Sequence, residues 1–172
     1  MPQTIGAFLA LSTVMMFSLN YQQTAIQSNM SAVNSEMEVM ANAVAAETMQ
    51  YISSKPFDSN TSNDTVTEKN AVSALLTNPI AFGRDGGFAD AMDIDDFHGM
   101  EPDSVWFPVT DSDGFNFTVK ATVRYIDDYG TESQVPTWLK EVTLTVDGPE
   151  NNGHKLLFHP VSVTRQFSPQ WY

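Results

Sequence analysis

Apolar residues recur along the first third of the chain at intervals of three, four or seven, which is the spacing of one face of an α-helix. No Pro or Gly interrupts residues 7–55, and residues 30–50 are rich in Ala, Met and Glu, which are good helix formers. Pro56 then supplies a stop signal. The pattern predicts one helix over residues 1–54. Its seam would be formed by Phe8, Ser12, Met15, Leu19, Ile26, Met30, Val33, Met37, Met40, Val44 and Tyr51.

Two different compositions divide this expected helix. Residues 5–19 carry no charge and are mostly apolar, whereas residues 20–54 are amphipathic. At 1.5 Å per residue the helix would be about 75 Å long, which is more than a domain of this size can cover. Lipid or copies of the same helix would then have to cover the apolar part. We call the residues expected to make this contact the assembly core: Phe8, Leu9, Leu11, Val14, Met15, Phe17, Leu19 and Ile26.

In the last third of the chain the apolar period becomes two, which is typical of β-strands. The runs that show it are 104–109, 115–127, 138–146 and 155–167. In the second run, Phe115 and every second residue through Tyr125 are apolar, and the residues between them are polar. Short connectors make neighbouring strands antiparallel. The pattern predicts an antiparallel sheet over residues 104–172, with the second half of the helix covering its apolar face.

Residues 55–103, between the helix and the sheet, are expected to be irregular. They begin with a Ser-, Thr- and Asn-rich loop, continue with one short helix over residues 70–78, and end in a Gly- and Asp-rich stretch over residues 83–103. The whole pattern predicts an α+β fold with two parts, the helix and a globular domain over residues 55–172.

The charge balance narrows the choice of partners. The chain has 21 Asp and Glu against eight Lys and Arg, which gives a net charge of −13. Nucleic acid and anionic lipid are held by clustered Lys and Arg, so we expect no nucleic-acid partner. The first basic residue is Lys55. The apolar run therefore lacks both the basic n-region of a signal peptide and the cationic flank that orients a membrane anchor.

Candidate chemistry is sparse. An acidic cluster could supply oxygen ligands for Ca²⁺, but it lacks the Glu that an EF-hand loop carries at its twelfth position, so we expect solvated turns. This cluster consists of Asp85, Asp90, Asp93, Asp95 and Asp96. The "DSDG" sequence at 111–114 and the pair Asp127–Asp128 also read as turns next to strands.

No catalytic or metal-binding motif is present in the sequence. The chain has no cysteine, and His98, His154 and His159 do not lie at metal-ligand spacing. Hydrolase, phosphate-loop and zinc-protease motifs are missing, so we expect no enzyme activity, no cofactor and no metal. N-x-S/T sequons begin at Asn29, Asn60, Asn63 and Asn116. Of these, Asn60 and Asn63 are the glycosylation candidates because they lie in an expected loop.

The order of these features resembles that of the type IV pilin and pseudopilin class. The resemblance rests on a long helix that is apolar first and amphipathic later, followed by a loop and the strand pattern "FTVKATVRYID…WLKEVTLTV". Members of the class carry a basic leader ending in Gly and a Glu at the fifth mature position, whereas the fifth residue here is Ile5. The similarity is therefore to a divergent or Tad-like lineage. It implies a lollipop-shaped subunit that is inserted in the inner membrane before assembly and lies afterwards in an extracellular filament.

Two functions follow from these expectations. The first is a structural subunit of a pilus-like filament at the cell surface, a homopolymer joined through its N-terminal helices, with a role in adhesion or motility. The second is a monomeric, membrane-anchored surface module that binds a ligand, or a minor pseudopilin of a secretion system. A charge introduced into the apolar run should distinguish these two functions, because a water-free core of many helices tolerates a charged side chain less than a single membrane anchor does.

Overall fold

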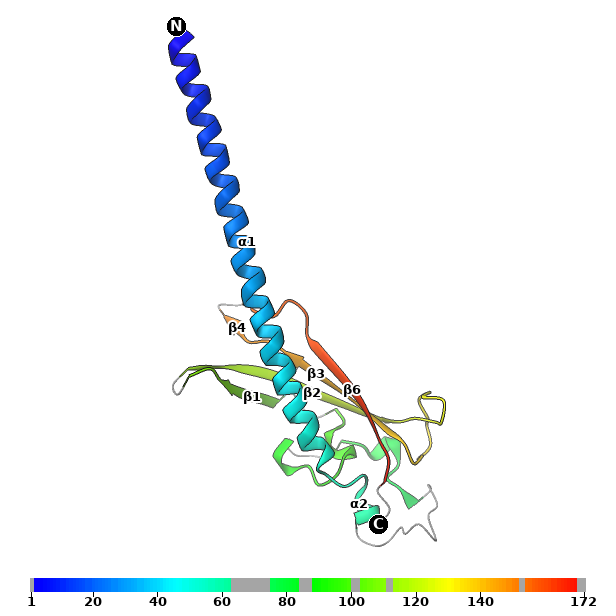
Figure 1. Ribbon diagram of the computed structural model, residues 1–172. Coiled ribbons are helices and arrows are strands. Elements are labelled where there is room, and N and C mark those ends of the chain that lie inside the picture. The colour runs from blue at the N-terminus through cyan, green and yellow to red at the C-terminus, as the bar shows by residue number, and fades with distance from the viewer. Residues whose placement is uncertain are drawn as a thin grey trace.

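A computed structural model shows one long helix followed by a four-stranded antiparallel sheet, which confirms the α+β prediction (Figure 1). Helix α1 runs without interruption from Pro2 to Ser53. The hydroxyls of Ser53 and Ser54 donate to carbonyls of the last turn, and Pro56 follows. The structure describes residues 2–62, 75–83, 88–99, 103–110, 113–151 and 154–169.

The sheet has the strand order β1-β2-β3-β6, and every neighbouring pair is antiparallel. Strands β4 (Glu150–Asn151) and β5 (His154–Lys155) form a separate small hairpin. The expected strand 155–167 was therefore too long, because residues 156–160 form an irregular link that contains Pro160. The bounds of the sheet strands are Asp103–Pro108 for β1, Gly114–Tyr125 for β2, Lys140–Asp147 for β3 and Val161–Phe167 for β6.

The two faces of the sheet have different chemistry. Along β2 the alternation predicted from the sequence is confirmed, since Phe117, Val119, Ala121, Val123 and Tyr125 are buried while Asn116, Thr118, Lys120 and Thr122 are exposed. The register Val119↔Val146 aligns the buried residues of β2 and β3 on one side. The polar side faces water.

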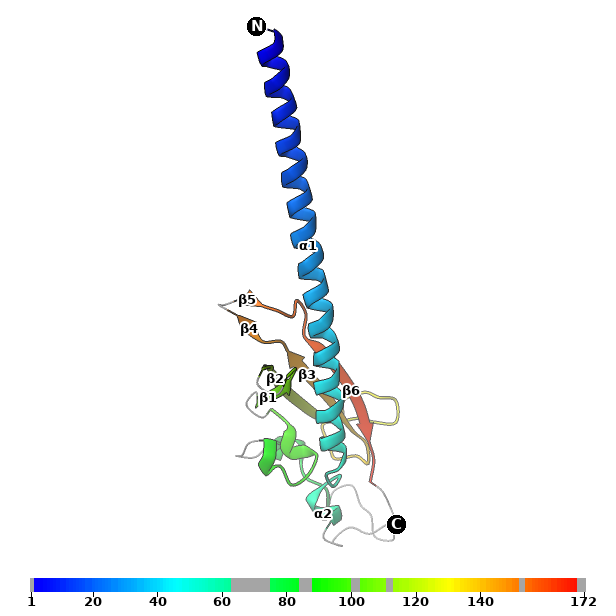
Figure 2. The ribbon, with the colours of Figure 1, turned by 60° about the vertical axis from the view of Figure 1, so that its left-hand side comes forward.

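The C-terminal part of α1 covers the apolar side of the sheet, as the sequence predicted (Figure 2). The seam was only partly right. Met37 and Val44 are buried, but Tyr51 is 38% exposed. A straight helix completes one turn every 3.6 residues, so positions that repeat every seven residues shift slowly around its axis. The face of α1 that contacts the sheet therefore moves to neighbouring positions along the helix. The buried stripe of α1 is Met37, Ala41, Val44, Ala45, Thr48, Met49 and Ile52.

The segment between α1 and the sheet is packed against the core. Its described residues include α2 (Ser59–Ser62) and the 3₁₀ turns η2 (Pro79–Ala81), η3 (Phe88–Asp90) and η4 (Asp95–Phe97). Phe57, Leu76, Phe82, Phe88, Ile94 and Phe97 are buried here. The expected short helix over residues 70–78 lies mostly outside the described residues.

Candidate functional site

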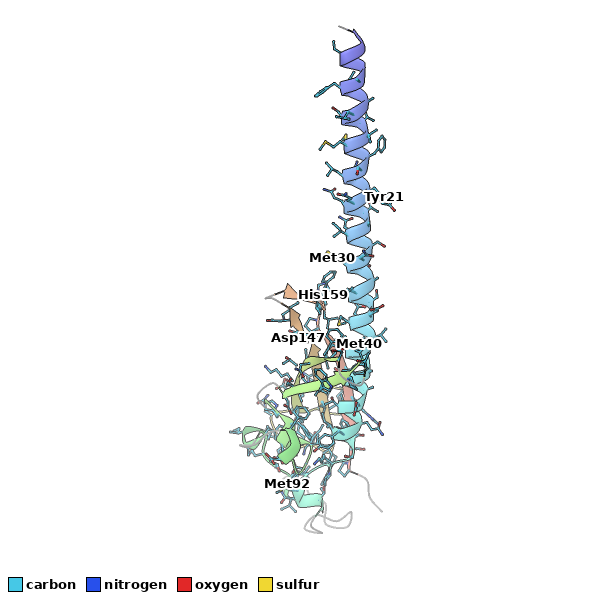
Figure 3. The ribbon with its side chains drawn as sticks, turned by 90° about the vertical axis from the view of Figure 1, so that its left-hand side faces the viewer. Tyr21, Met30, Met40, Met92, Asp147 and His159 are labelled. Carbon is cyan, nitrogen blue, oxygen red and sulfur yellow. The ribbon has the colours of Figure 1, made fainter. Side chains whose placement is uncertain are left out.

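The first half of α1 stands clear of the domain (Figure 1). All eight expected assembly-core side chains lie on it, with exposed fractions between 53% at Leu19 and 71% at Phe17. Among the described side chains, the first that is buried along the helix is Met37. Tyr21 likewise projects from the helix with no other segment beside it (Figure 3). The domain therefore leaves the apolar helix surface uncovered.

Apolar side chains surround this part of the helix. Leu9 is one position after Phe8, and Leu11 is two positions after Leu9. At 3.6 residues per turn, these three side chains point in different directions around the helix axis. A helix that is apolar all round is typically buried in a core or in a membrane. Over the described residues one helix is long and apolar enough to cross a membrane, and it lies near the N-terminus, where a signal sequence would pass the same test.

Hydroxyl groups in the apolar part bond to the helix itself. Ser12 Oγ donates to the carbonyl of Phe8 at 2.9 Å, and Thr13 Oγ1 donates to the carbonyl of Leu9 at 2.8 Å. Thr24 makes the same contact with the carbonyl of Asn20. Burying an unpaired hydroxyl is costly, whereas these groups keep their donor bonds when water is removed. The hydroxyls of Ser12 and Thr13 therefore lose no donor bond when the apolar part of α1 enters an apolar environment.

A buried ionic cluster lies in the globular domain, at the start of β3. Lys140 is 0% exposed, and its Nζ donates to Asp95 Oδ1 at 2.6 Å, to Asp58 Oδ2 at 3.2 Å and to the Phe57 carbonyl at 2.6 Å. The aromatic rings of Phe57, Tyr125 and Phe82 surround the ammonium, with centroids 4.4, 5.2 and 5.5 Å from Nζ. This site was not predicted from the sequence. Its one signal was a Lys in the buried register of a strand, two residues before Val142.

Burial raises the pKa of Asp95 from 3.8 to about 7. Lys140 opposes that increase and the nearby Asp93 carboxylate adds to it. Burial also raises the pKa of the Tyr125 phenol, with Asp58 and Asp95 as further causes, and the phenol donates to the carbonyl of Thr77. One cation facing two carboxylates leaves the cluster with an excess of negative charge, which a bound proton relieves.

The acidic cluster expected in solvated turns is in part a buried structural site. Asp93 and Asp95 are 4% and 3% exposed, so the prediction of solvation was wrong for these two residues. Asp93 Oδ2 accepts from the backbone N–H of Ser59, and Asp96 Oδ2 accepts from that of Met92. Asp85 lies outside the described residues. Among the described residues no group of three or more His, Asp or Glu side chains is placed to hold a metal ion.

The other turn predictions are confirmed where the structure describes them. Asp127 Oδ1 accepts from the N–H groups of Tyr129 and Thr131, which closes the turn after β2. In the "DSDG" sequence, the carbonyl of Asp113 accepts from the N–H groups of Val109 and Thr110. These aspartates hold turns together.

Of the two glycosylation candidates, Asn63 lies outside the described residues. Asn60 Nδ2 donates to the carbonyl of Leu75 at 2.9 Å, so a glycan at Asn60 would disrupt this bond. The exposed sequon positions are Asn29 on α1 and Asn116 on β2.

An open cleft of about 500 Å³ lies beside the polar side of the sheet, between β2, β3 and the loop that contains Glu132. Arg124 in this cleft is paired with Glu141 at 2.5 Å and with Glu132 at 3.6 Å. His98 Nδ1 lies 2.6 Å from the carbonyl oxygen of Val123. The charged and imidazole groups of the cleft are thus engaged with the protein itself.

Searches of protein-family models, curated proteins and solved structures find no match to this chain. The exposed apolar part of α1 is the candidate functional site, because within the described residues it is a long, continuous apolar surface that the domain does not cover.

Proposed function

We propose that this protein is a structural subunit of a pilus-like filament at the cell surface, polymerising through the first half of α1. Copies of the helix pack together in the filament core, and the sheet domains form the outer shell. Before assembly the apolar run is inserted in the inner membrane, and adhesion or motility is the role of the finished filament. The supporting evidence is the exposed, uncharged helix surface and the pilin-like order of the elements.

The observation that carries the proposal is the length of the projecting helix. Residues 5–36 precede the first buried position of α1, and 32 residues extend about 48 Å at 1.5 Å per residue. The hydrocarbon core of a bilayer is only about 30 Å thick. A simple anchor would leave about 18 Å of helix bare between the membrane and the domain. That stretch carries the exposed apolar residues Ile26, Met30 and Val33.

Packing of helices would bury the whole of this surface. Each fully buried large apolar side chain contributes about 1.5–3 kcal/mol, so the eight assembly-core residues together would favour association by more than about 10 kcal/mol per subunit before entropy costs. The absence of charge before Glu36 suits such a core, because an unpaired charge inside it would be strongly unfavourable.

The second candidate is a membrane-anchored surface module or a minor pseudopilin. It is favoured by the finding that α1 is long and apolar enough to span a membrane. Such a protein would need the apolar run for insertion only, and would not form filaments alone.

The two candidates respond differently to Met15→Lys. In a many-helix core the new ammonium has no acid within the first 35 residues to pair with, and the penalty of several kcal/mol recurs in every subunit. A single anchor tolerates a central Lys at about 2.5–3.5 kcal/mol and relieves part of that by snorkelling. We therefore expect Met15→Lys to abolish surface filaments while the protein stays membrane-associated. Val14→Lys should behave in the same way.

Matched controls are available in the globular domain. Met92 and Val135 are as exposed as Met15 and Val14, at 78% and 65%, but lie on the domain surface. Met92→Lys and Val135→Lys add the same charge and should leave filaments intact. The measurement is electron microscopy of cell-surface material, together with fractionation of membranes. Normal filaments with Lys at both helix positions would refute assembly through α1 and favour the anchored module.

A further inference from the structure

Three segments that are distant in sequence meet at the side chain of Lys140. Asp58 follows the end of α1, Asp95 begins η4, and Lys140 begins β3. Lys140 Nζ is 2.6 Å from Asp95 Oδ1 and 3.2 Å from Asp58 Oδ2. All three side chains are at most 4% exposed. A primary amine and two carboxyl groups are thus held together away from bulk water.

We propose that Lys140 and Asp58 form an intramolecular amide bond, between Lys140 Nζ and Asp58 Cγ, with Asp95 carrying the protons. Asp58 is the acceptor because its carboxyl group is held by the backbone. Its Oδ1 accepts from the N–H of Asn60 at 3.0 Å, and its Oδ2 accepts from the N–H of Thr77 at 2.8 Å. Donors placed in this way stabilise the negative charge that develops on the oxygens when an amine adds to the carbon.

Asp95 is placed to move the protons. Its Oδ1 lies 2.6 Å from Lys140 Nζ, within the range for direct proton transfer between hydrogen-bonded groups. Burial raises its pKa to about 7, so the carboxyl group can both accept and return a proton near neutral pH.

The reaction balances without any further reagent. The Lys140 ammonium gives a proton to the Asp95 carboxylate, which passes it to an oxygen of Asp58, so that the free amine faces a neutral carboxylic acid. The amine then attacks Cγ of Asp58 to form the C–N bond. Asp95 takes a second proton from the nitrogen and delivers it to the Asp58 hydroxyl as the C–O bond breaks, and one water molecule leaves. Asp95 ends in its starting state, and an ammonium and a carboxylate have become an amide.

The surroundings favour this outcome over the ion pair. The rings of Phe57, Phe82 and Tyr125 line the site, so the charged pair is kept from water while the neutral amide needs less solvation. The fold also holds the Lys140 amine and the Asp58 carboxyl group next to each other, so they need not meet by diffusion. Well-oriented intramolecular reactions reach effective concentrations of about 10⁵–10⁸ M. The product would join the chain at the end of α1 covalently to β3. Tension applied through the helix would then pass directly into the sheet.

The test is the intact mass of the full chain, purified in detergent and measured after denaturation. The expected mass is lower than that of the sequence by one water molecule. Tandem mass spectrometry of a digest should yield a branched peptide that joins the Asp58 and Lys140 segments. In Lys140→Arg, which keeps the cation, and in Asp58→Ala, the mass should equal that of the substituted sequence. In Asp95→Asn, which cannot carry a proton, the bond should likewise fail to form.

Each other outcome contradicts the proposal. The full sequence mass for the folded wild-type chain would mean that the cluster is an ion pair only. A loss of water that persists in Lys140→Arg would indicate a different reaction, such as ring closure at Asp113–Gly114. A loss of ammonia in Asp95→Asn would place the acceptor at residue 95 instead of Asp58. Because the wild-type mass alone decides the main point, variants that fail to fold do not leave the question open.

Discussion

Deleting residues 1–24 should leave a folded, monomeric and soluble domain. No described side chain in this part of α1 is buried, and the helix continues from Ala25 to Ser53 after the deletion. The contact between α1 and the irregular link is also kept, because Asn34 Oδ1 accepts from the N–H of Phe158 at 2.9 Å. The deletion removes seven of the eight assembly-core residues, all except Ile26, and no described side chain that is buried.

The expected change in the free energy of unfolding is correspondingly small. Surface changes away from buried contacts usually alter stability by about 0.5 kcal/mol or less. Extending the deletion to residues 1–45 makes an informative contrast. That change removes Met37 and Val44, which are 3% and 1% exposed, together with Ala41 and Ala45. Loss of the two larger side chains costs about 3–6 kcal/mol at 1.5–3 kcal/mol each, and it uncovers the sheet as well, which a domain with 5–15 kcal/mol of stability hardly survives.

Light scattering measures the association state of each deletion variant. Urea unfolding, monitored by circular dichroism, measures its stability. The shorter deletion should be monomeric and unfold cooperatively, and the longer one should lack a cooperative transition. Large assemblies of the shorter deletion would show that α1 residues 1–24 are not needed for association. Unfolding of the shorter deletion would place the domain boundary elsewhere.

Two further predictions concern the domain itself. Unfolded Asp95 loses its proton near pH 3.8 and the folded residue near pH 7, so its stabilising contribution is complete at low pH and is lost as the pH rises through about 7. Urea unfolding between about pH 4 and pH 8 should show this decline in the wild type, and a flatter profile in Asp95→Asn. Phe117→Ala should cost about 3–5 kcal/mol, because Phe117 is 0% exposed, whereas Asn116→Ala on the opposite face should be nearly neutral. Equal losses in the two variants would contradict the assignment of the faces.

Local periodicity accounts for most of the fold that could be predicted. The uninterrupted run to Pro56 indicated the helix, and the alternation from Phe115 to Tyr125 indicated which face of β2 is buried. Both patterns depend on backbone geometry that repeats over a few residues. The drift of the buried stripe away from Tyr51 was not predicted, because a seven-residue repeat only approximates the turn of a straight helix.

The candidate assembly surface could be read from the sequence for a similar reason. Fifteen consecutive residues without charge identify an apolar helix surface wherever the domain lies. Whether the domain would cover that surface depended on where α1 meets the sheet, and the structure places the first buried contact at Met37. Burial begins at Met37 because the strands of the sheet cover only the C-terminal part of α1.

The sequence by itself determined the long helix, the alternating strands and the uncharged apolar run, since each is a property of neighbouring residues. Only the tertiary structure decided the surroundings of Lys140. Its position in the buried register of β3 was readable, but its partners Asp58 and Asp95 are 82 and 45 residues away along the chain. No periodic pattern links positions so far apart, so Asp95, which was expected in a solvated turn, and Asp58, which lay in an expected loop, became buried partners of one lysine when the chain folded.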